Sequence, residues 1–151
     1  MAGDTTGAYA LHAGEGPTYS FGREWIVKAG ERGPGRRLAF VDFTTRRGEE
    51  PGPHVHPTED EIFYVLMGEL TFRCGGETFD VRTGGFIYLP QGIEHGYTIR
   101  SEGAVHLLVV TFPTSTTPGK GRGGFIADVE RQGELLTRPE NQTGSGEVQQ
   151  P

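Results

Sequence analysis

Cysteine is almost absent from this sequence, and long hydrophobic runs are missing altogether. Cys74 is the only cysteine among 151 residues, so no disulfide can form within the chain, which suits a reducing compartment. No stretch approaches the roughly 20 apolar residues that a membrane-spanning helix needs. The first twenty residues include Asp4 and Glu15 and lack the basic start and apolar stretch of a secretory signal. We therefore expect a cytoplasmic protein with no membrane partner.

Positive charge is also scarce, because 14 Lys and Arg residues stand against 20 Asp and Glu residues, a net charge of −6 at pH 7. Binding to nucleic-acid phosphates or to an anionic membrane needs clustered Lys and Arg side chains. The two basic pairs, Arg36-Arg37 and Arg46-Arg47, are short, and we interpret them as solvated loop edges. The composition therefore argues against a nucleic-acid partner. A chain of this length has room for one domain with a real core.

Glycine and proline, in contrast, are abundant, with 25 and 10 residues respectively. They separate short segments rich in aromatic and β-branched residues, a pattern that predicts strands joined by tight turns. The nine expected strands are Tyr19–Phe21, Glu24–Ala29, Arg37–Thr44, Glu61–Leu66, Leu70–Cys74, Thr78–Val81, Phe86–Leu89, Gly96–Ile99 and Val105–Phe112. Their spacing of roughly ten residues indicates an all-β fold, either a sandwich or a barrel.

Two of these segments allow a more detailed prediction. Gly75-Gly76 lies between two alternating strands, and two glycines supply the positive φ values that a two-residue hairpin turn requires. The strand Glu61–Leu66 is apolar on both faces after Glu61, and such strands are usually covered on both sides. We therefore expect the outward face of this strand to lie in a subunit interface.

The ends of the chain differ in composition from its middle. We expect a flexible N-terminal segment over 1–15 with one strand-like piece around Ala8–His12, a β-barrel domain over 16–113, a loop and short helix over 114–136, and a disordered tail over 137–151. The helix is expected at Phe125–Glu134, where apolar residues recur at helical spacing. The tail contains almost no apolar side chains that could be buried.

Four residues in two separate stretches form a metal-ligand pattern. His54 and His56 are one residue apart, so a strand would point both imidazoles to the same side. Glu61 follows after a turn, and His95 begins a later strand. Three neutral imidazoles and one carboxylate suit a divalent transition metal ion such as Fe, Mn, Co, Ni, Cu or Zn. The formal charge of such a site is about +1, which would favour anionic oxygen donors such as enolates, phenolates or carboxylates.

The same two stretches resemble the two motifs of the cupin superfamily, G-x5-H-x-H-x4-E-x6-G and G-x5-P-x-G-x2-H-x3-N. The first runs from Gly48 to Gly68 and the second from Gly84 to Ile99, which replaces the usual asparagine. The resemblance covers about Trp25 to Phe112. It implies a cupin jelly-roll β-barrel (a double-stranded β-helix), commonly a homodimer, with a short C-terminal helix and flexible tails added here.

Carried onto this sequence, the ligands of the family fall on His54, His56, Glu61 and His95. Asp60 would be the ligand under a shorter spacing, but only Glu61 leaves six residues before Gly68. We therefore interpret Glu59 and Asp60 as solvated turn acids.

Several side chains are expected to surround the metal. Phe63 and Val65 share a strand face with Glu61, and Tyr97 and Ile99 share a face with His95, so these four residues are expected in the substrate pocket. Tyr97 would either hydrogen-bond a substrate oxygen and relay a proton or serve as a plain aromatic wall. Two further residues receive no role in the site: His106 is interpreted as a packed or surface histidine and Cys74 as a small buried hydrophobe away from the ligands.

Three functions are compatible with such a site. The layout is similar to the quercetin 2,3-dioxygenase-like monocupins, which implies a metal-dependent dioxygenase that cleaves a flavonol- or enol-like small molecule with O2. Glu61 would then both bind the metal and accept the hydroxyl proton of the substrate. The alternative is a non-redox cyclase, isomerase or dehydratase of polyketide-like metabolites, in which Glu61 or Tyr97 moves protons. A barrel that only binds a small ligand is the third hypothesis.

Overall fold

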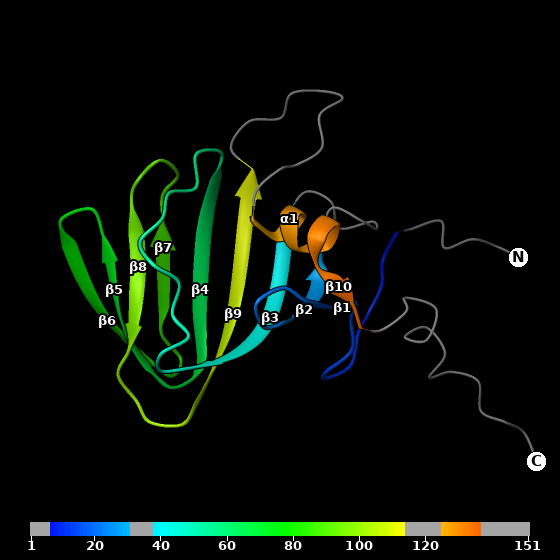
Figure 1. The fold of residues 1–151 in the computed structure, drawn as a ribbon, viewed down its shortest axis with the longest axis horizontal. Helices are drawn as coiled ribbons and strands as arrows, with labels where there is room; N and C mark the ends of the chain where they lie inside the picture. Colours follow the sequence, from blue (N-terminus) through cyan, green and yellow to red (C-terminus); the bar gives the residue numbers. More distant parts are fainter. Residues whose placement is uncertain (1–6, 31–37, 114–124, 137–151) are drawn as a thin grey trace, which may run out of the picture.

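The computed structural model describes residues 7–30, 38–113 and 125–136, which form strands and one short helix (Figure 1). In chain order the elements are β1 (Thr18–Ser20), β2 (Glu24–Ala29), β3 (Ala39–Arg46), β4 (Glu59–Met67), β5 (Glu69–Cys74), β6 (Glu77–Arg82), β7 (Phe86–Leu89), β8 (His95–Ile99), β9 (Ala104–Pro113), α1 (Phe125–Gln132) and β10 (Glu134–Leu135). Within this part of the chain, no helix is long and apolar enough to span a membrane.

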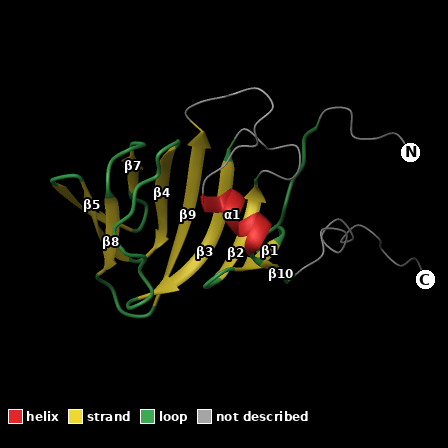
Figure 2. Cartoon of the chain, turned by 45° about the horizontal axis from the view of Figure 1, so that its top comes forward, coloured by secondary structure: helices red, strands yellow, loops and turns green. Residues whose placement is uncertain are grey.

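The strands form two antiparallel sheets that enclose the core. The larger sheet has the order β10-β1-β2-β3-β9-β4-β7, and the smaller has the order β6-β5-β8. Figure 1 shows the small sheet on the left and the large sheet curving away from it to the right, with α1 beside the β1 end. Figure 2 shows the same helix lying across that end of the large sheet. The architecture is the jelly-roll that the sequence predicted.

Alternation along the central strands explains how the core forms. In β3 the residues Ala39, Val41, Phe43 and Thr45 are buried, and the residues between them are half-buried or exposed. A strand turns successive side chains to opposite faces, so one apolar set points between the sheets. β9 pairs with β3 residue by residue from Ala39–Thr111 to Arg46–Ala104, and it contributes the matching buried set from its own inner face. Burial of these two sets accounts for the pairing register.

A cluster of aromatic rings fills the space between the two sheets. Phe72 of β5 is fully buried, and its ring centroid lies 5.3 Å from that of Phe63 and 5.5 Å from that of Tyr97. Aromatic pairs at these distances add to the free energy gained by burial. Phe63 belongs to the large sheet and Tyr97 to the small one, so Phe72 fixes the separation of the two sheets at the point where both carry site residues.

The expected strands are confirmed with ends that shift by at most two residues. The strand-like piece expected at Ala8–His12 was wrong, because residues 7–12 form no strand. The helix begins at Phe125 as expected but ends at Gln132, and Glu134–Leu135 then forms β10 by pairing with β1. The predictions for residues 1–6, 31–37, 114–124 and 137–151, including the basic pair Arg36-Arg37, lie outside the described residues.

The β5–β6 hairpin turns at Gly75-Gly76 as predicted, because Cys74 pairs with Glu77. Only Gly75 takes a positive φ, of 58°, so the expectation of two such residues was wrong. One glycine in this conformation is enough for a two-residue turn of the II′ type.

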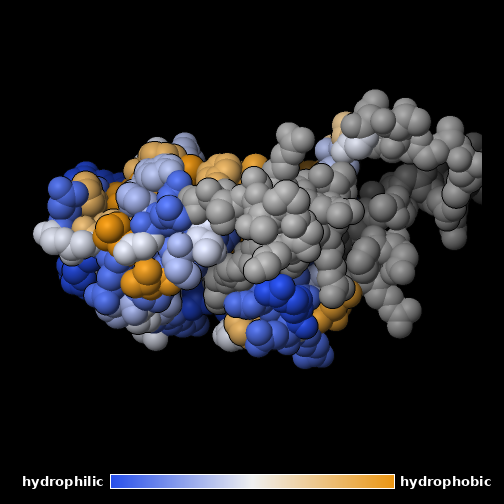
Figure 3. Space-filling model, turned by 90° about the horizontal axis from the view of Figure 1, so that it is seen from above, coloured by the Kyte–Doolittle hydropathy of each residue, from blue (hydrophilic) through white to orange (hydrophobic). Residues whose placement is uncertain are grey.

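The outward face of β4 is apolar and lies open in the single chain. Tyr64 is 42% exposed and Leu66 is 36% exposed, and on β7 Phe86 and Tyr88 are exposed beside them. On the face seen from above in Figure 3, apolar residues appear as separate orange groups among polar ones. The subunit interface expected on β4 stays a prediction, and the exposed apolar side chains are compatible with it.

Candidate metal centre

The four motif residues come from three places in the chain that the fold brings together. His54 forms an isolated bridge with His95, in which each backbone N–H donates to the carbonyl of the other at 2.9 Å. Pro53, directly before His54, has no N–H to donate to a longer ladder. His56 is tied by its carbonyl to the N–H of Gly92 at 2.9 Å. Glu61 points inward from β4.

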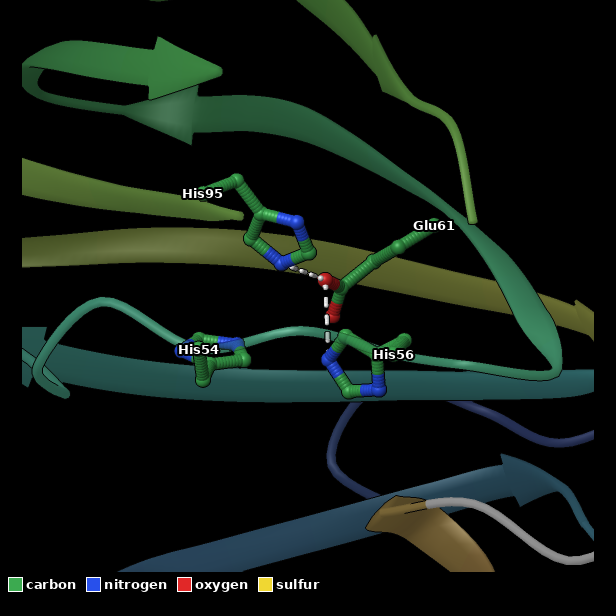
Figure 4. A group of neighbouring side chains, drawn as sticks. All are labelled: His54, His56, Glu61 and His95. Atoms are coloured by element: carbon green, nitrogen blue, oxygen red, sulfur yellow. Dashed lines mark ion pairs between the residues drawn. The ribbon is translucent and has the colours of Figure 1, made fainter. Parts of the chain in front are cut away.

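The side chains of the four residues converge on one point (Figure 4). One donor atom from each of His54, His56, Glu61 and His95 can be chosen so that all four lie within 4.8 Å of one another. Oε2 of Glu61 lies 2.9 Å from Nε2 of His95 and 3.4 Å from Nε2 of His56. His54 is half-buried and the other three are buried. A set of one carboxylate and three imidazoles could therefore hold a metal ion.

Each imidazole has an oxygen beside Nδ1, which leaves Nε2 directed to the centre. Nδ1 of His54 lies 2.8 Å from the carbonyl of Gly52, and Nδ1 of His95 lies 3.3 Å from the carbonyl of Ile93. Nδ1 of His56 lies 3.5 Å from Oε1 of Glu59. An N–H that donates to such an oxygen fixes the proton on Nδ1 and leaves a lone pair on Nε2, which is the form that binds a metal.

Three of the converging atoms are buried and have no hydrogen-bond partner, namely Nε2 of His56, Nε2 of His95 and Oε2 of Glu61. Their close approach does not have the angles of a hydrogen bond, so proximity alone does not satisfy them. Buried polar atoms in native proteins almost always find a partner, and each exception calls for an explanation. A metal ion would bind all three at once, so the residues present fit such a group.

Two of the four residues, His56 and Glu61, have strongly shifted pKa values when no metal is bound. Contact with Glu59, followed by contact with Glu61, raises the pKa of His56 to about 10. Burial alone would raise the pKa of Glu61, but the contacts with His56 and His95 outweigh it and hold the pKa of Glu61 at about 2. In the metal-free site Glu61 therefore stays ionised, and protonated His56 carries positive charge that a metal ion would otherwise supply.

The interpretation of Glu59 as a solvated turn acid was wrong. Glu59 is only 1% exposed and points inward from β4, on the same face as Glu61. Strand β4 begins at Glu59 rather than Glu61, and period-two alternation then turns Glu59 into the site. Asp60, between them, points outward, where it accepts hydrogen bonds from the hydroxyl of Tyr88 and the N–H of Gln91.

A cavity of about 850 Å³ opens beside the four residues, and part of its wall is aromatic. The aromatic residues that line it are Phe21, Trp25, Phe43, Phe63 and Tyr97. Val65 and Ile99, expected in this wall, are at most 1% exposed and do not line the cavity. Each lies four residues beyond its ligand, roughly 13 Å along the strand, and so belongs to the core.

Tyr97 contacts this cavity as a buried phenol. Burial raises its pKa to about 12, although the nearby Arg23 guanidinium opposes the rise. The hydroxyl therefore stays protonated and can donate a hydrogen bond at neutral pH. Phe63 forms the neighbouring wall, with its ring centroid 5.8 Å from that of Tyr97.

His106 and Cys74, the two residues without an expected role in the site, differ in their distance from the metal ligands. Nε2 of His106 contacts Oδ1 of Asp42, a residue that is not among those lining the cavity, so His106 is a partnered histidine outside the site. Cys74 is directly opposite His95 in the β5–β8 pair, so the expectation that it lies away from the ligands was wrong. It is half-buried and does not line the cavity.

Sequence reasoning missed Arg23, Phe43 and Glu59 as cavity residues. The sequence does indicate Glu59, because it lies two residues before Glu61 and so shares its strand face. The others reach the cavity only through the β2–β3 pairing and the β1–β2 turn, for which the local sequence carries no marker.

Comparison with known proteins gives consistent matches. Residues 41–111 match the family model described as a cupin domain. Quercetin 2,3-dioxygenase of Bacillus subtilis is 33% identical over 94 residues, which is 62% of this chain and 28% of that protein. Polyketide synthase CurC of Streptomyces cyaneus is 28% identical over 76 residues, covering 50% of this chain and 49% of that protein. The chain thus spans less than half the length of these two relatives.

Among solved structures, a predicted oxalate decarboxylase from Thermotoga maritima superposes with a TM-score of 0.60 at 19% identity. The match covers 70% of this chain and 99% of that one. At this identity the likeness concerns the fold.

Proposed function

The chain belongs to the cupin superfamily, and from its site we propose that it binds one divalent transition metal ion and acts as a metal-dependent enzyme on an enol-like small molecule. The observation that carries this proposal is the set of three buried ligand atoms without hydrogen-bond partners, open to a cavity of about 850 Å³. A purely structural site would need no cavity of this size beside it.

The aromatic wall supports a planar, largely apolar substrate. Phe63 and Tyr97 stand beside the ligand residues, and Trp25 and Phe43 continue the wall further out. Flat aromatic or conjugated molecules bury their faces well against such rings. A cavity of this size accommodates a molecule of several rings and excludes bulk water around it once filled.

Two side chains supply the proton chemistry. A bound divalent ion would polarise the oxygens of an enol or phenol and make its hydroxyl more acidic. Glu61, ionised in this site, would accept that hydroxyl proton at its carboxylate. Tyr97, protonated, would donate a hydrogen bond to a second substrate oxygen. Together they orient the substrate oxygens toward the ligand residues.

Within this frame, the reaction we propose is oxidative cleavage of a flavonol or related enol by O2. Similarity to the Bacillus subtilis quercetin 2,3-dioxygenase supports this choice over other reactions of the superfamily. Holding the two reactants together in one cavity lowers the entropic part of the barrier.

The test uses the full chain stripped of metal and reloaded separately with Fe, Mn, Co, Ni, Cu and Zn. Flavonol absorbance and oxygen uptake are followed together, with the metal-free protein and the variant Glu61→Gln as controls. The proposal expects coupled loss of flavonol and O2 with at least one redox-active metal and none with either control. If every loaded form leaves both signals unchanged, the dioxygenase assignment is wrong.

A second candidate, a non-redox cyclase, isomerase or dehydratase, has its own support. The carboxylate of Glu61 and the protonated phenol of Tyr97 line one cavity, as an acid–base pair would. Similarity to the polyketide synthase CurC points to the same class of metabolite. Turnover of a polyketide-like enol that persists without oxygen, or with Zn, favours this candidate over the dioxygenase.

A further inference from the structure

Arg23 is the one arginine among the described residues that line the large cavity. It occupies the turn between β1 and β2, where its carbonyl accepts the N–H of Phe21 at 2.9 Å. The wall runs from Arg23 over Trp25 and Phe43 to Phe63, and Phe63 is two residues from the ligand Glu61. The cavity therefore has a metal-binding side and a guanidinium side, and the hydroxyl of Tyr97 contacts the guanidinium.

The guanidinium of Arg23 is held in place by its neighbours. Its centre lies 5.5 Å from the ring centroid of Trp25 and 5.8 Å from that of Phe43. One terminal nitrogen donates to Oγ1 of Thr45, and the other donates to the carbonyl of Glu49. A planar cation stacked on aromatic rings and fixed by two hydrogen bonds loses little freedom when it binds a ligand.

The guanidinium of Arg23 also has N–H donors that its contacts with neighbouring residues do not use. A guanidinium has five N–H donors, and the contacts with Thr45, Glu49 and the Tyr97 hydroxyl use at most three of them. Among the residues that the structure describes, no carboxylate forms an ion pair with Arg23. Asp128, which also lines the cavity, is paired instead with Arg131 at 2.9 Å.

The charges at the cavity wall also favour a role for Arg23 in binding an anion. Four ligands around a divalent ion leave a formal charge of about +1. Arg23 supplies a further positive charge at the described cavity wall.

We propose that Arg23 is the second anchor of the substrate and binds a carboxylate carried at the end of the molecule remote from the metal-binding oxygens. This inference rests on the proposed function, because it assumes that the other end of the substrate meets the metal. A carboxylate matches the planar fork of a guanidinium and forms charge-assisted hydrogen bonds with it. The preferred substrate class is therefore a carboxylated enol or phenol rather than a neutral one.

The test compares two probes that share one chelating group. Kojic acid and comenic acid are both hydroxypyranones, and they differ by a hydroxymethyl group in the first and a carboxylate in the second. Their affinities are measured by calorimetry on the Zn-loaded and the metal-free full chain, since Zn is redox-inert and gives binding without oxidation. The wild type, Arg23→Gln, Arg23→Lys and the exposed control Arg82→Gln are compared, each after its Zn content and thermal midpoint have been checked.

The expected result is that the Zn-loaded wild type binds comenic acid about ten to a hundred times more tightly than kojic acid, as a charge-assisted contact predicts. Arg23→Gln removes this preference and leaves the affinity for kojic acid within about threefold, Arg23→Lys keeps part of it, and Arg82→Gln keeps all of it. Two results overturn the inference while leaving the metal-chelation proposal intact: a wild type without preference, or an unchanged preference in Arg23→Gln. Equal loss of both probes in Arg23→Gln with full Zn content assigns Arg23 a structural role and also overturns it. Failure of both probes to bind better with Zn than without it overturns the metal-chelation proposal itself, and this inference with it.

Discussion

Nδ1 of His56 faces Oε1 of Glu59 at 3.5 Å, with both side chains buried. The carboxylate sits behind the imidazole, on the side away from the converging ligand atoms, where it would accept the Nδ1–H of a metal-bound His56. Carboxylates placed behind ligating histidines orient the ring and make it a better donor. Glu59 is thus a positioning residue for the candidate metal centre rather than a ligand.

Replacement of Glu59 should weaken metal binding without removing a ligand. We expect Glu59→Gln to lower the affinity for Zn or Co by about 10- to 100-fold, because an amide holds the Nδ1–H less firmly than a carboxylate. The measurement is competition against a chromophoric chelator. Asp60→Asn is the matched control, since Asp60 is adjacent in sequence but points outward, and it should stay within about threefold of the wild type. Equal effects of the two substitutions would contradict the assigned role.

The metal-free protein should have a pH window of greatest stability set by two coupled groups. The pKa of His56 is raised from 6.5 to about 10, so its contribution is fully present below pH 6.5 and disappears as the pH rises through 10. The pKa of Glu61 is lowered from 4.5 to about 2, so its contribution is present above pH 4.5 and disappears as the pH falls through 2. The free energy of unfolding should therefore be greatest between these limits, from pH 4.5 to 6.5.

Urea unfolding of chelator-treated protein across this range provides the measurement. In His56→Gln, the free energy of unfolding should decline less as the pH rises through 10. Its loss at acid pH should also be smaller, because Glu61 then keeps only His95 as a close partner. A wild-type stability that keeps rising above pH 7 would contradict the raised pKa of His56.

Much of the fold was accessible from the sequence because its determinants are local. Alternation of period two and the glycines at the turns act over a few residues, and the nine expected strands follow from them. The two-residue strand β10 was missed because nothing in Glu134–Leu135 distinguishes it from a helix end. It exists only because Tyr19 and Ser20 offer partners across the sheet edge.

The site was accessible in part for the same reason. His54, His56, Glu61 and His95 were found because metal ligation restricts residue type and spacing together. The sequence predicted that the strand begins at Glu61, so the alternation that buries Glu59 was not recognised. Arg23 was out of reach because its position depends on how the β1–β2 turn meets the end of β3, a contact between residues 22 positions apart.

Removal of the metal should destabilise the protein by an amount that depends on its free concentration. A ligand that binds only the folded state at about a thousand times its Kd adds about 4 kcal/mol, which corresponds to a thermal midpoint about 8 to 16 °C higher for a chain of this size. We expect this shift on adding Zn or Co to metal-free wild type. His95→Ala, which deletes a buried ligand, should lose most of it, whereas His106→Ala, outside the site, should keep it. Calorimetric scans with and without metal measure both, and a full shift in His95→Ala would contradict the ligand assignment.

The outward face of β4 should hold two copies of the chain together. Tyr64 is 42% exposed and lies between Leu108 of β9 and Phe86 of β7, so it marks the centre of an apolar strip on the sheet. We expect the wild type to form a homodimer and Tyr64→Asp to weaken it by at least about tenfold, because an unpaired charge would be buried at the centre of the interface. Sedimentation equilibrium measures the dissociation constant of each form. Phe79→Asp is the control, since Phe79 is 41% exposed but belongs to the other sheet, and it should leave the dimer intact. If the wild type sediments as a monomer at its highest soluble concentration, or if Phe79→Asp dissociates the dimer as strongly as Tyr64→Asp does, the interface does not lie on β4.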